Sequence, residues 1–392
     1  TMKLLKRTWA DVSLDNLAHN YTVLRQQVPA ACRFLGVVKA DAYGHGAVPV
    51  SHHLEELGAE FLAVSNLEEA VQLRRGEVRS PILILGYTPA QYARDLAEMD
   101  LRQEVHSLAY ARELEARLVG TDSRLQVHLK LDTGMARLGF FCQEGERVLE
   151  ELLTVTRMPH LEVEGMFTHF PVADSLDPAD EAFTREQFRL FQRFVAGMEA
   201  AGVRPEICHC CNSGATIAYP EFSMDMVRPG VATYGIAPSQ DLAGRLDLRP
   251  LLTLQTTISQ IRSYPAGVPV SYGRTYVTPA PRTLAVVSIG YADGLSRQLS
   301  GRVSFLLRGR QVPVVGRICM DMCMVDVTDV PEARVGDPVT VLGTGEDGAP
   351  SACGLASQLG TIPYEILCSI SKRIPRIYLD GKKRTEILQY IV

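Results

Sequence analysis

A lysine follows an apolar run in the segment VVKADAYGHG, which spans residues 37–46. The apolar residues 34–38 predict a buried strand, and the glycines after the lysine predict a turn. At that junction the stem of Lys39 is packed and its amine is partly desolvated, which favours the neutral, nucleophilic form. These properties suit an imine bond to an aldehyde, as in lysines that carry pyridoxal phosphate. The alternative is a lysine that ends a strand and reaches solvent beside a turn.

Four other positions carry groups suited to an anion or to an aromatic ring. Arg137 presents a fork that grips a carboxylate or a ring oxygen, and His169 has a ring able to lie on the face of a cofactor. Ser213 precedes a helical pattern, where a hydroxyl binds phosphate readily, and Gly230 lets backbone N–H groups approach a phosphate closely. The ordinary alternatives are a solvated arginine, a core histidine, a helix cap and a turn glycine.

Three cysteines and a histidine at residues 208–211 have the composition of a metal site. However, no second pair of cysteines or histidines lies at the spacing of a zinc site. In a strand these residues alternate between faces, so the four side chains cannot converge on one ion. The sequence therefore predicts no metal site.

Short apolar runs alternate with longer amphipathic ones in the first two thirds of the chain, after an opening helical pattern at 15–27. The strand candidates are 34–40, 61–65, 81–86, 102–106, 125–132, 162–169, 207–212 and 224–230. Eight strands that alternate with helices predict an α/β fold, a parallel (β/α)8 barrel. A doubly wound open sheet is the alternative, but no glycine-rich dinucleotide fingerprint follows the first strand.

The barrel hypothesis predicts that residues with a chemical role lie at the carboxyl ends of the strands. Five strand candidates end in polar or charged residues. They end at Lys39, at the segment 132–137 that contains Arg137, at His169, at Asn212 and Ser213, and at Arg228 and Gly230. Chance explains some of this pattern, because strands often end in polar residues, but five such ends favour a common site.

The pattern changes near residue 245. Apolar and β-branched runs separated by short turns follow at 252–261, 284–289, 303–307, 312–315, 322–327 and 339–342. They predict a separate, mostly-β domain over residues 245–392, with one helix near 351–359. Residues 1–244 would form the barrel domain, although some of the first dozen residues are expected to pack on the β domain.

Composition and charge exclude several classes of protein. The chain of 392 residues has a net charge of −5 and no basic stripe, so we expect no nucleic-acid partner. No apolar run approaches a membrane-spanning length, so we expect no membrane partner. The first seven residues lack the apolar core of a signal peptide. The nine cysteines sit mostly inside apolar runs, and we expect reduced thiols and a cytoplasmic location.

Four segments together are similar to motifs of one known family. The segment VVKADAYGHG at 37–46 resembles the cofactor-lysine signature of the alanine racemases. The segments GYADG at 290–294, GRICMD at 316–321 and IPYE at 362–365 resemble motifs of the same family. The resemblance extends over nearly the whole chain. It implies a pyridoxal-phosphate enzyme, an isomerase that racemises L-alanine and D-alanine and supplies D-alanine for bacterial peptidoglycan.

The resemblance also implies a role for individual residues. Lys39 holds the cofactor and acts as one catalytic base, and Tyr291 is the second base on the opposite face. Arg137 and the backbone of Met320 hold the substrate carboxylate. The residues that would bind the cofactor, besides Lys39, are Tyr43, His169, Asn212, Ser213, Arg228, Gly230, Val231 and Tyr364. In the family, Tyr291 and Met320 act across the interface of a homodimer whose active sites are shared between subunits.

Three further residues refine this expectation. In the family, the arginine at 228 faces the pyridine nitrogen, and a guanidinium cannot give that nitrogen a proton, which favours simple proton exchange over transamination. A lysine matching Lys130 can carry a carbamate that hydrogen-bonds to Arg137; an ordinary ion-paired lysine is the alternative. Tyr364 stands where serine-preferring relatives carry asparagine, which favours alanine. Pro229 and Pro363 are departures from the expected pattern.

Three other functions share some of these features. A basic amino-acid decarboxylase has the same two-domain plan and cofactor, but it lacks the Tyr291 motif. A non-catalytic pyridoxal-phosphate carrier is a lone barrel, so the β domain argues against it. An aldolase that forms an imine without a cofactor would be colourless, so the absorbance spectrum of the protein distinguishes it.

Overall fold

Eight parallel strands close into a barrel in the computed structural model, which describes residues 7–346 and 348–391. The strands are β2 (Arg33–Val37), β3 (Phe61–Val64), β4 (Ile82–Ile84), β5 (Leu101–Val105), β6 (Leu125–Asp132), β8 (Leu161–Phe167), β9 (Ile207–His209) and β10 (Met226–Val227). Each strand pairs in parallel with its neighbours, and the pairing of β5 with β6 closes the ring. The predicted (β/α)8 barrel is therefore confirmed.

The chain divides into two compact units, which we call the barrel unit and the β unit. The barrel unit takes in Ala18–Ala42 and Ala47–Leu248. The β unit takes in the chain from Arg249 onward, the N-terminal residues up to Leu17, and the short segment Tyr43–Gly46. The segment that follows Lys39 thus contributes residues to both units.

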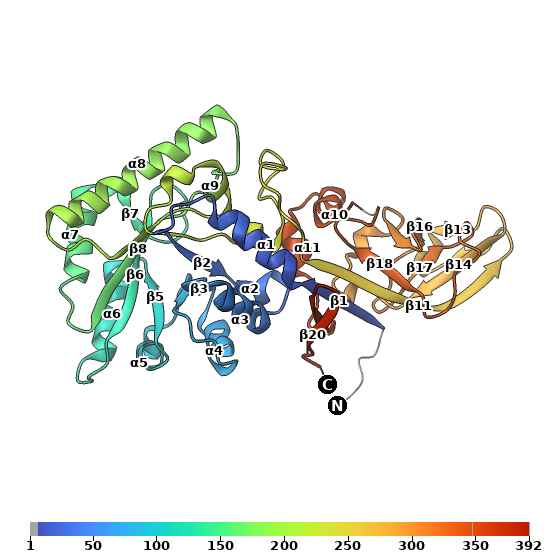
Figure 1. Ribbon diagram of the computed structural model, residues 1–392, viewed down its shortest axis with the longest axis horizontal. Helices are drawn as coiled ribbons and strands as arrows, with labels where there is room; N and C mark the ends of the chain where they lie inside the picture. The colour runs from blue at the N-terminus through green and yellow to red at the C-terminus, as the bar shows by residue number, and fades with distance from the viewer. Residues whose placement is uncertain (1–6, 347, 392) are drawn as a thin grey trace. The chain divides into compact units, whose positions relative to one another are not determined.

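Helices surround the strands of the barrel unit (Figure 1). They are α3 (Ala47–Leu57), α4 (Leu67–Arg75), α5 (Ala93–Glu98), α6 (Leu108–Leu118), α7 (Glu146–Val155), α8 (Pro178–Ala200) and α9 (Ser213–Ala218); α1 (Leu14–Arg25) precedes β2 and α2 (Lys39–Tyr43) follows it. Several begin at a side chain that accepts a backbone N–H, as Asn66 does for α4, Ser107 for α6 and Asp177 for α8. Their apolar faces cover strands that are buried on both sides.

The β unit contains a nine-stranded sheet. Its order is β14 (Arg282–Val287), β17 (Cys323–Asp326), β16 (Arg310–Val315), β15 (Ser304–Leu307), β18 (Pro338–Leu342), β11 (Leu252–Tyr264), β1 (Thr8–Ser13), β19 (Arg376–Asp380) and β20 (Lys383–Leu388). All pairs are antiparallel except β1 with β19. The predicted mostly-β region is confirmed, and the expected packing of the first residues takes the form of an interior strand, β1, between β11 and β19.

Two smaller features complete the β unit. A hairpin of β12 (Pro269–Val270) and β13 (Tyr276–Val277) stands apart from the main sheet. The helix predicted at 351–359 is present as α10 (Ala352–Leu359), but a second helix, α11 (Pro363–Cys368), follows it and was not predicted. The strand core is apolar: Phe305, Val325 and Val339 are fully buried.

In the barrel unit, a further short strand, β7 (Phe140–Phe141), pairs with β6.

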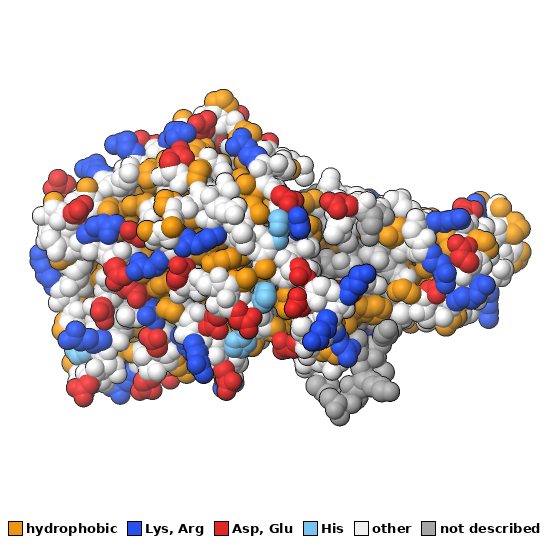
Figure 2. Space-filling model, viewed as in Figure 1, with side chains coloured by type: hydrophobic (Ala, Val, Ile, Leu, Met, Phe, Trp, Pro, Cys, Tyr) orange, Lys and Arg blue, Asp and Glu red, His pale blue; other side chains and the backbone are white. Residues whose placement is uncertain are grey.

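The visible surface carries charged side chains of both signs, interspersed rather than segregated (Figure 2). On this face no large patch carries charge of a single sign. Among the described residues, no helix has the length and apolarity needed to cross a membrane.

Candidate active site

The backbone after Lys39 turns with the opposite hand to an ordinary helix. Residues 40–43 have φ values of 52°, 56°, 52° and 52°, all in the left-handed region. Residues with a Cβ pay about 1–2 kcal/mol each to adopt it. The sequence predicts a turn at the glycines, and Gly44 and Gly46 do have φ values of 81° and 95°; the left-handed stretch nevertheless begins four residues earlier, at residues that carry a Cβ.

Three hydrogen bonds, one of them to a side chain distant in sequence, hold this turn within the barrel unit. The Glu69 carboxylate accepts the backbone N–H of Ala40 at 2.7 Å, and the Asp41 carboxylate accepts that of Ala47 at 2.9 Å. Ala42 N–H donates to the carbonyl of Val38 at 2.9 Å. These bonds compensate for the backbone strain and fix the direction in which Lys39 leaves the end of β2.

Four cations gather around His169, two residues beyond the end of β8. Burial lowers the pKa of His169 well below its usual range, and Arg228, Arg137, Lys130 and Lys39 lower it further, in that order. The imidazole is therefore neutral at physiological pH. Burial and then Arg137 lower the pKa of Lys130 to about 8. The barrel unit thus concentrates positive charge at the carboxyl ends of its strands.

A cradle of backbone N–H groups meets a serine hydroxyl near the same strand ends. The Ser213 Oγ atom accepts the N–H of Gly230 at 2.8 Å and that of Ala232 at 3.3 Å. Asn212 caps α9, because its Oδ1 atom accepts the N–H of Ala215 at 3.0 Å. Val231 is fully buried and begins the 3-10 helix η4 (Val231–Tyr234). Chain segments 17 residues apart thereby meet at one corner.

Arg228 is almost completely buried and makes several hydrogen bonds. Its guanidinium lies 2.7 Å from His209 Nδ1 and donates to the carbonyls of Thr168 at 2.8 Å and Cys210 at 3.3 Å. It also lies over the Phe167 ring, 5.3 Å from the centroid. Burial lowers the pKa of Arg228 to about 10, so the group stays protonated at neutral pH. Pro229, which follows it, has no N–H, but its carbonyl accepts the N–H of Val37.

The residues at 208–211 point in different directions. His209 bonds to Arg228, whereas the Cys208 and Cys210 thiols donate to the carbonyls of Pro205 and Phe222. Within residues 7–346 and 348–391, no three side chains of His, Cys, Asp or Glu come together as metal ligands. Sequence reasoning treated His209 only as part of this cluster and missed its contact with Arg228, because the two lie on different strand ends.

In the β unit, the segments that contain Tyr291 and Met320 are joined by their backbones. Tyr291 N–H donates to the carbonyl of Cys319 and Ala292 N–H to that of Met320, both at 3.0 Å. A Cβ on Gly290 would lie 2.3 Å from the Cys319 carbonyl oxygen, so only glycine permits this approach. The side chains of Tyr291 and Met320 are 43% and 53% exposed.

The buried Asp293 side chain fixes the backbone of the turn that carries Tyr291. Its fully buried carboxylate accepts two N–H groups from Arg7, at 2.6 and 3.2 Å, and the N–H of Gly290 at 3.0 Å. The charge of Arg7 compensates for the burial of the carboxylate. Sequence reasoning regarded this motif as a turn with a catalytic tyrosine and missed the aspartate, whose partner lies 286 residues away.

Tyr43 and Tyr364 lie together elsewhere in the β unit. Their ring centroids are 6.0 Å apart, and burial, then Tyr364 and Cys368, raises the pKa of Tyr43. Pro363 occupies the first turn of α11, where its missing N–H removes no helical bond. The Arg376 guanidinium, fully buried, donates to the Gly44 carbonyl at 3.0 Å and so fixes the chain beside Tyr43.

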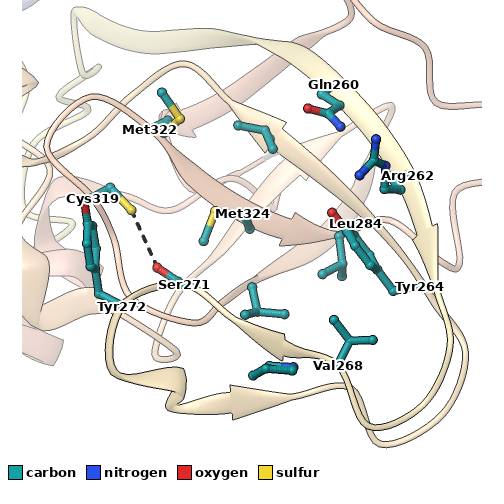
Figure 3. Close-up of a pocket in the computed structure, with 13 residues that line it drawn as sticks. Gln260, Arg262, Tyr264, Val268, Ser271, Tyr272, Leu284, Cys319, Met322 and Met324 are labelled. Atoms are coloured by element: carbon teal, nitrogen blue, oxygen red, sulfur yellow. Dashed lines mark hydrogen bonds between the residues drawn. The ribbon is translucent and has the colours of Figure 1, made fainter.

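An apolar hollow of about 560 Å³ lies between β11, β14, β17 and the β12–β13 hairpin (Figure 3). Val270 and Leu284 belong to its apolar core. Cys319 and Ser271 face each other at one end, and Gln260 and Arg262 lie at the other. The lining residues include Tyr272 and Met322, which are 69% and 47% exposed. The β unit therefore combines an exposed tyrosine motif with a sizeable exposed apolar surface.

The fold and the rim geometry define a class of protein: a (β/α)8-barrel enzyme with an additional β unit and a cationic site at the carboxyl ends of the barrel strands. Two family models match the chain. "Alanine racemase, N-terminal domain" matches residues 12–238, and "Alanine racemase, C-terminal domain" matches residues 251–378.

Individual alanine racemases are similar to this chain over nearly its whole length. The alanine racemase of Desulfosudis oleivorans is 43% identical over 380 residues, which are 95% of this chain and 97% of the relative. The solved structure of alanine racemase from Clostridium difficile 630 is 36% identical, with a TM-score of 0.94 and full coverage of both chains. That from Bacillus anthracis with bound L-Ala-P is 35% identical, with a TM-score of 0.92 and 99% coverage of both chains. The chain belongs to the alanine racemase family of enzymes.

Proposed function

We propose that this alanine racemase depends on pyridoxal 5'-phosphate and interconverts L-alanine and D-alanine with two bases, Lys39 and Tyr291. The observation that carries the proposal is the group of four cations, Lys39 among them, that act on His169. The proposed product, D-alanine, would supply bacterial peptidoglycan. The substrate inference is supported by the relatives, one of which, from Clostridium difficile 630, has been solved in complex with cycloserine.

The donor groups of the barrel unit fit the cofactor. The Ser213 Oγ atom already accepts two N–H groups, so its own proton is suited to a phosphate oxygen. Gly230 and Val231 supply backbone at the same corner, Asn212 holds that corner in place, and Arg228 supplies a permanently protonated donor for a ring nitrogen. The phosphate and ring charges would be matched by surrounding cations.

Two tyrosines are also proposed as phosphate ligands. We propose that the Tyr43 and Tyr364 hydroxyls contact the phosphate, which is supported by the proximity of their rings. His169 would lie against the cofactor ring as a neutral imidazole, because burial and the adjacent cations disfavour its protonation. A neutral ring adds no further repulsion to the cations that surround it.

When bound, pyridoxal phosphate supplies an electron-withdrawing ring that acidifies the α-proton of the amino acid. The Lys39 amine would remove or return this proton on one face, and the Tyr291 hydroxyl would do so on the other. Two bases are needed, since a single base tends to return the proton to the face from which it came. Arg137 and the Met320 backbone N–H would hold the substrate carboxylate and so fix which face each base meets.

Tyr291 and Met320 would act on the site of a second copy of the chain, in a homodimer. The proposal is supported by their exposure and by the adjacent apolar hollow that Cys319 and Tyr272 line. Exposed apolar surface of this kind is costly in water and is typical of an interface. The dimer would cover it and enclose Tyr291 with the cofactor of the partner.

Lys130 would carry a carbamate. Only a neutral amine reacts with carbon dioxide, and the lowered pKa of about 8 gives Lys130 a substantial neutral fraction near physiological pH. The product is an anion, which would relieve the repulsion between Lys130 and Arg137 and hold the guanidinium in place. The alternative is an ordinary lysine paired with a carboxylate. The candidate carboxylate is Glu104, whose charge raises the pKa of Lys130.

A visible absorbance spectrum followed by an assay of D-alanine formation from L-alanine tests the function. We expect the band of lysine-bound cofactor together with racemisation, and we expect Lys39→Ala to lose both. The band without racemisation would favour decarboxylation or another amino-acid substrate. Absence of the band after addition of cofactor would overturn the assignment of Lys39.

A further inference from the structure

A chain of hydrogen bonds links Arg228 to a carboxylate deep in the barrel. The Arg228 guanidinium lies 2.7 Å from His209 Nδ1, and His209 Nε2 lies 2.8 Å from His128 Nδ1. His128 Nε2 in turn lies 2.9 Å from Glu164 Oε2. Both imidazoles are completely buried. A typical barrel is filled by branched apolar side chains. Burial of this polar chain therefore costs desolvation free energy, which suggests that the chain has a function.

The chemistry of arginine fixes the direction of every bond in this chain. A guanidinium only donates, so His209 Nδ1 accepts and carries no proton. Burial, then the nearby Arg228 and His128, lowers the pKa of His209 well below its usual range, so the ring is neutral and its proton lies on Nε2. That proton is donated to His128 Nδ1. Burial also lowers the pKa of His128, so its single proton lies on Nε2 and is donated to Glu164.

Packing restricts the planes of both rings. Phe167 stacks on His209 with centroids 4.9 Å apart and an angle of 6°. A Cβ on Gly165 would lie 2.4 Å from His128 Nδ1, so glycine is needed where this ring meets the backbone of β8. The rings are therefore held in place, and only their tautomers remain to be selected.

Glu164 acts in this chain as an acceptor more than as a charge. Arg102 lies 3.2 Å from the same Oε2 atom and already neutralises the carboxylate. Burial raises the pKa of Glu164, but the His128 bond and Arg102 outweigh it and leave the pKa below its usual value. Without an acceptor at this point, the His128 Nε2 proton would be buried without a partner, and the opposite tautomer would become competitive.

Arg228 depends on this selection. Among the described residues, three of its five N–H groups bond to His209, Thr168 and Cys210, which leaves two for a bound ligand. If His209 carried its proton on Nδ1, that proton would face the guanidinium and displace it. We propose that Glu164 is a positioning residue for the racemisation proposed above: by fixing the tautomers of His128 and His209, it orients Arg228 toward the cofactor.

Glu164→Met and Glu164→Gln separate the acceptor from the charge. Glu164→Met removes the acceptor, so we expect kcat to fall about 10- to 100-fold at nearly constant KM, since a misaligned group costs this much. In Glu164→Gln the amide oxygen still accepts the His128 proton, so we expect activity within a few-fold of wild type. Glu162→Gln, an exposed position on the same strand, is the matched control and should change nothing.

A second measurement does not depend on turnover. Nitrogen-15 NMR of the two histidines, with and without cofactor, reports which ring nitrogen is protonated. We expect both on Nε2 in the wild type and in Glu164→Gln, and mixed tautomers in Glu164→Met. Wild-type kcat and unmixed tautomers in Glu164→Met would overturn the proposal, as would equal losses in the Gln and Met variants. Since the comparison needs an active wild type, failure of the racemase function itself would be seen separately.

Discussion

The two units hold their proposed functional residues in opposite ways. In the barrel unit several of the residues concerned are buried: Lys130, Ser213 and Arg228 are each 5% exposed or less, although Arg137 is exposed. Ser213 and Arg228 are already hydrogen-bonded. In the β unit Tyr291 and Met320 are 43% and 53% exposed. Their backbones are firmly fixed, but their side chains have solvent where a catalytic group needs a dry, shaped environment.

This difference shows which contacts fix the orientation of the functional side chains in each unit. The barrel orients its groups through bonds made on folding, as the chain from Arg228 to Glu164 illustrates. The β unit orients only the backbone that carries Tyr291 and leaves the environment of the side chain to another surface. A site built in this way is expected to be fully formed only in the homodimer proposed here.

Loss of the Tyr291 hydroxyl has the largest expected effect among the changes that compare the two units. Tyr291→Phe should lower kcat/KM for racemisation by about 10³-fold, because a positioned acid or base contributes about 10²–10⁴. The folded state should be nearly as stable as wild type, since the side chain is half exposed. In deuterated water, Lys39 should still exchange the α-proton of D-alanine without inversion, whereas exchange from L-alanine should be lost.

Mixing variants tests whether Tyr291 serves its own chain or a partner. Lys39→Ala and Tyr291→Phe chains, unfolded together and refolded, should recover about a quarter of wild-type activity, because half of randomly formed dimers are mixed and each has one complete site. Each variant refolded alone is the control and should remain inactive. No recovery on mixing would mean that Tyr291 acts within its own chain. The proposal that a second chain completes the environment of Tyr291 would then be wrong.

A smaller effect is expected from the buried cation of the barrel unit. The pKa of Lys130 is about 8 in the folded chain, against about 10.4 in an unfolded one. The unfolded state therefore binds more protons between these values, and this group makes folding more favourable as the pH rises through them. Lys130→Met should be more stable than wild type near neutral pH by about 1–3 kcal/mol and should lose most of this advantage by about pH 10.

Urea unfolding of the cofactor-free protein in buffer without carbon dioxide measures this difference. Substitution of the exposed Lys382 by methionine is the control and should give a small change at every pH. A constant stability difference between Lys130→Met and wild type across the pH range would contradict the role of Lys130 as a buried, strained cation in the barrel.

The smallest effect on the single chain is expected at the apolar surface of the β unit. Tyr272 is 69% exposed, so Tyr272→Ser should change the unfolding free energy of the chain by no more than about 0.5 kcal/mol. If this surface is the interface, the dimer dissociation constant should rise about tenfold or more, because aromatic residues dominate interface energies. Sedimentation velocity across a dilution series measures it, with Tyr92→Ser in the barrel unit, 40% exposed, as the control.

The fold could be predicted from local patterns to a large extent. All eight barrel strand candidates are present, because apolar runs bounded by turn residues report burial directly. Their ends were less accurate: β8 ends at Phe167 and β9 at His209, whereas the candidates ran to His169 and Asn212. Polar residues at a strand end leave the hydrogen-bonded ladder and form the loops that carry the site. Helix α11 was missed because a six-residue helix gives too little periodicity.

Part of the candidate site could also be anticipated, because a lysine, histidine, serine or arginine next to a predicted strand end is visible in the chain itself. The residues that support them were not visible. Glu69 holds the turn after Lys39 from 29 positions away, Arg7 holds Asp293 from 286, and His209 meets His128 from 81. No local pattern encodes such pairs, since neither partner differs from an ordinary surface or core residue until the strands are aligned.

By itself, the sequence determined the alternation of strands and helices, the change to β structure near residue 245 and the chemical identity of the groups at the strand ends. These follow from short-range preferences for burial, turns and capping, which act within a few residues. The left-handed turn after Lys39, the entry of β1 into the β unit and the burial of charge around Arg228 were decided only by the tertiary structure. Each is unfavourable locally, and each exists because bonds made by distant residues on folding outweigh that local cost.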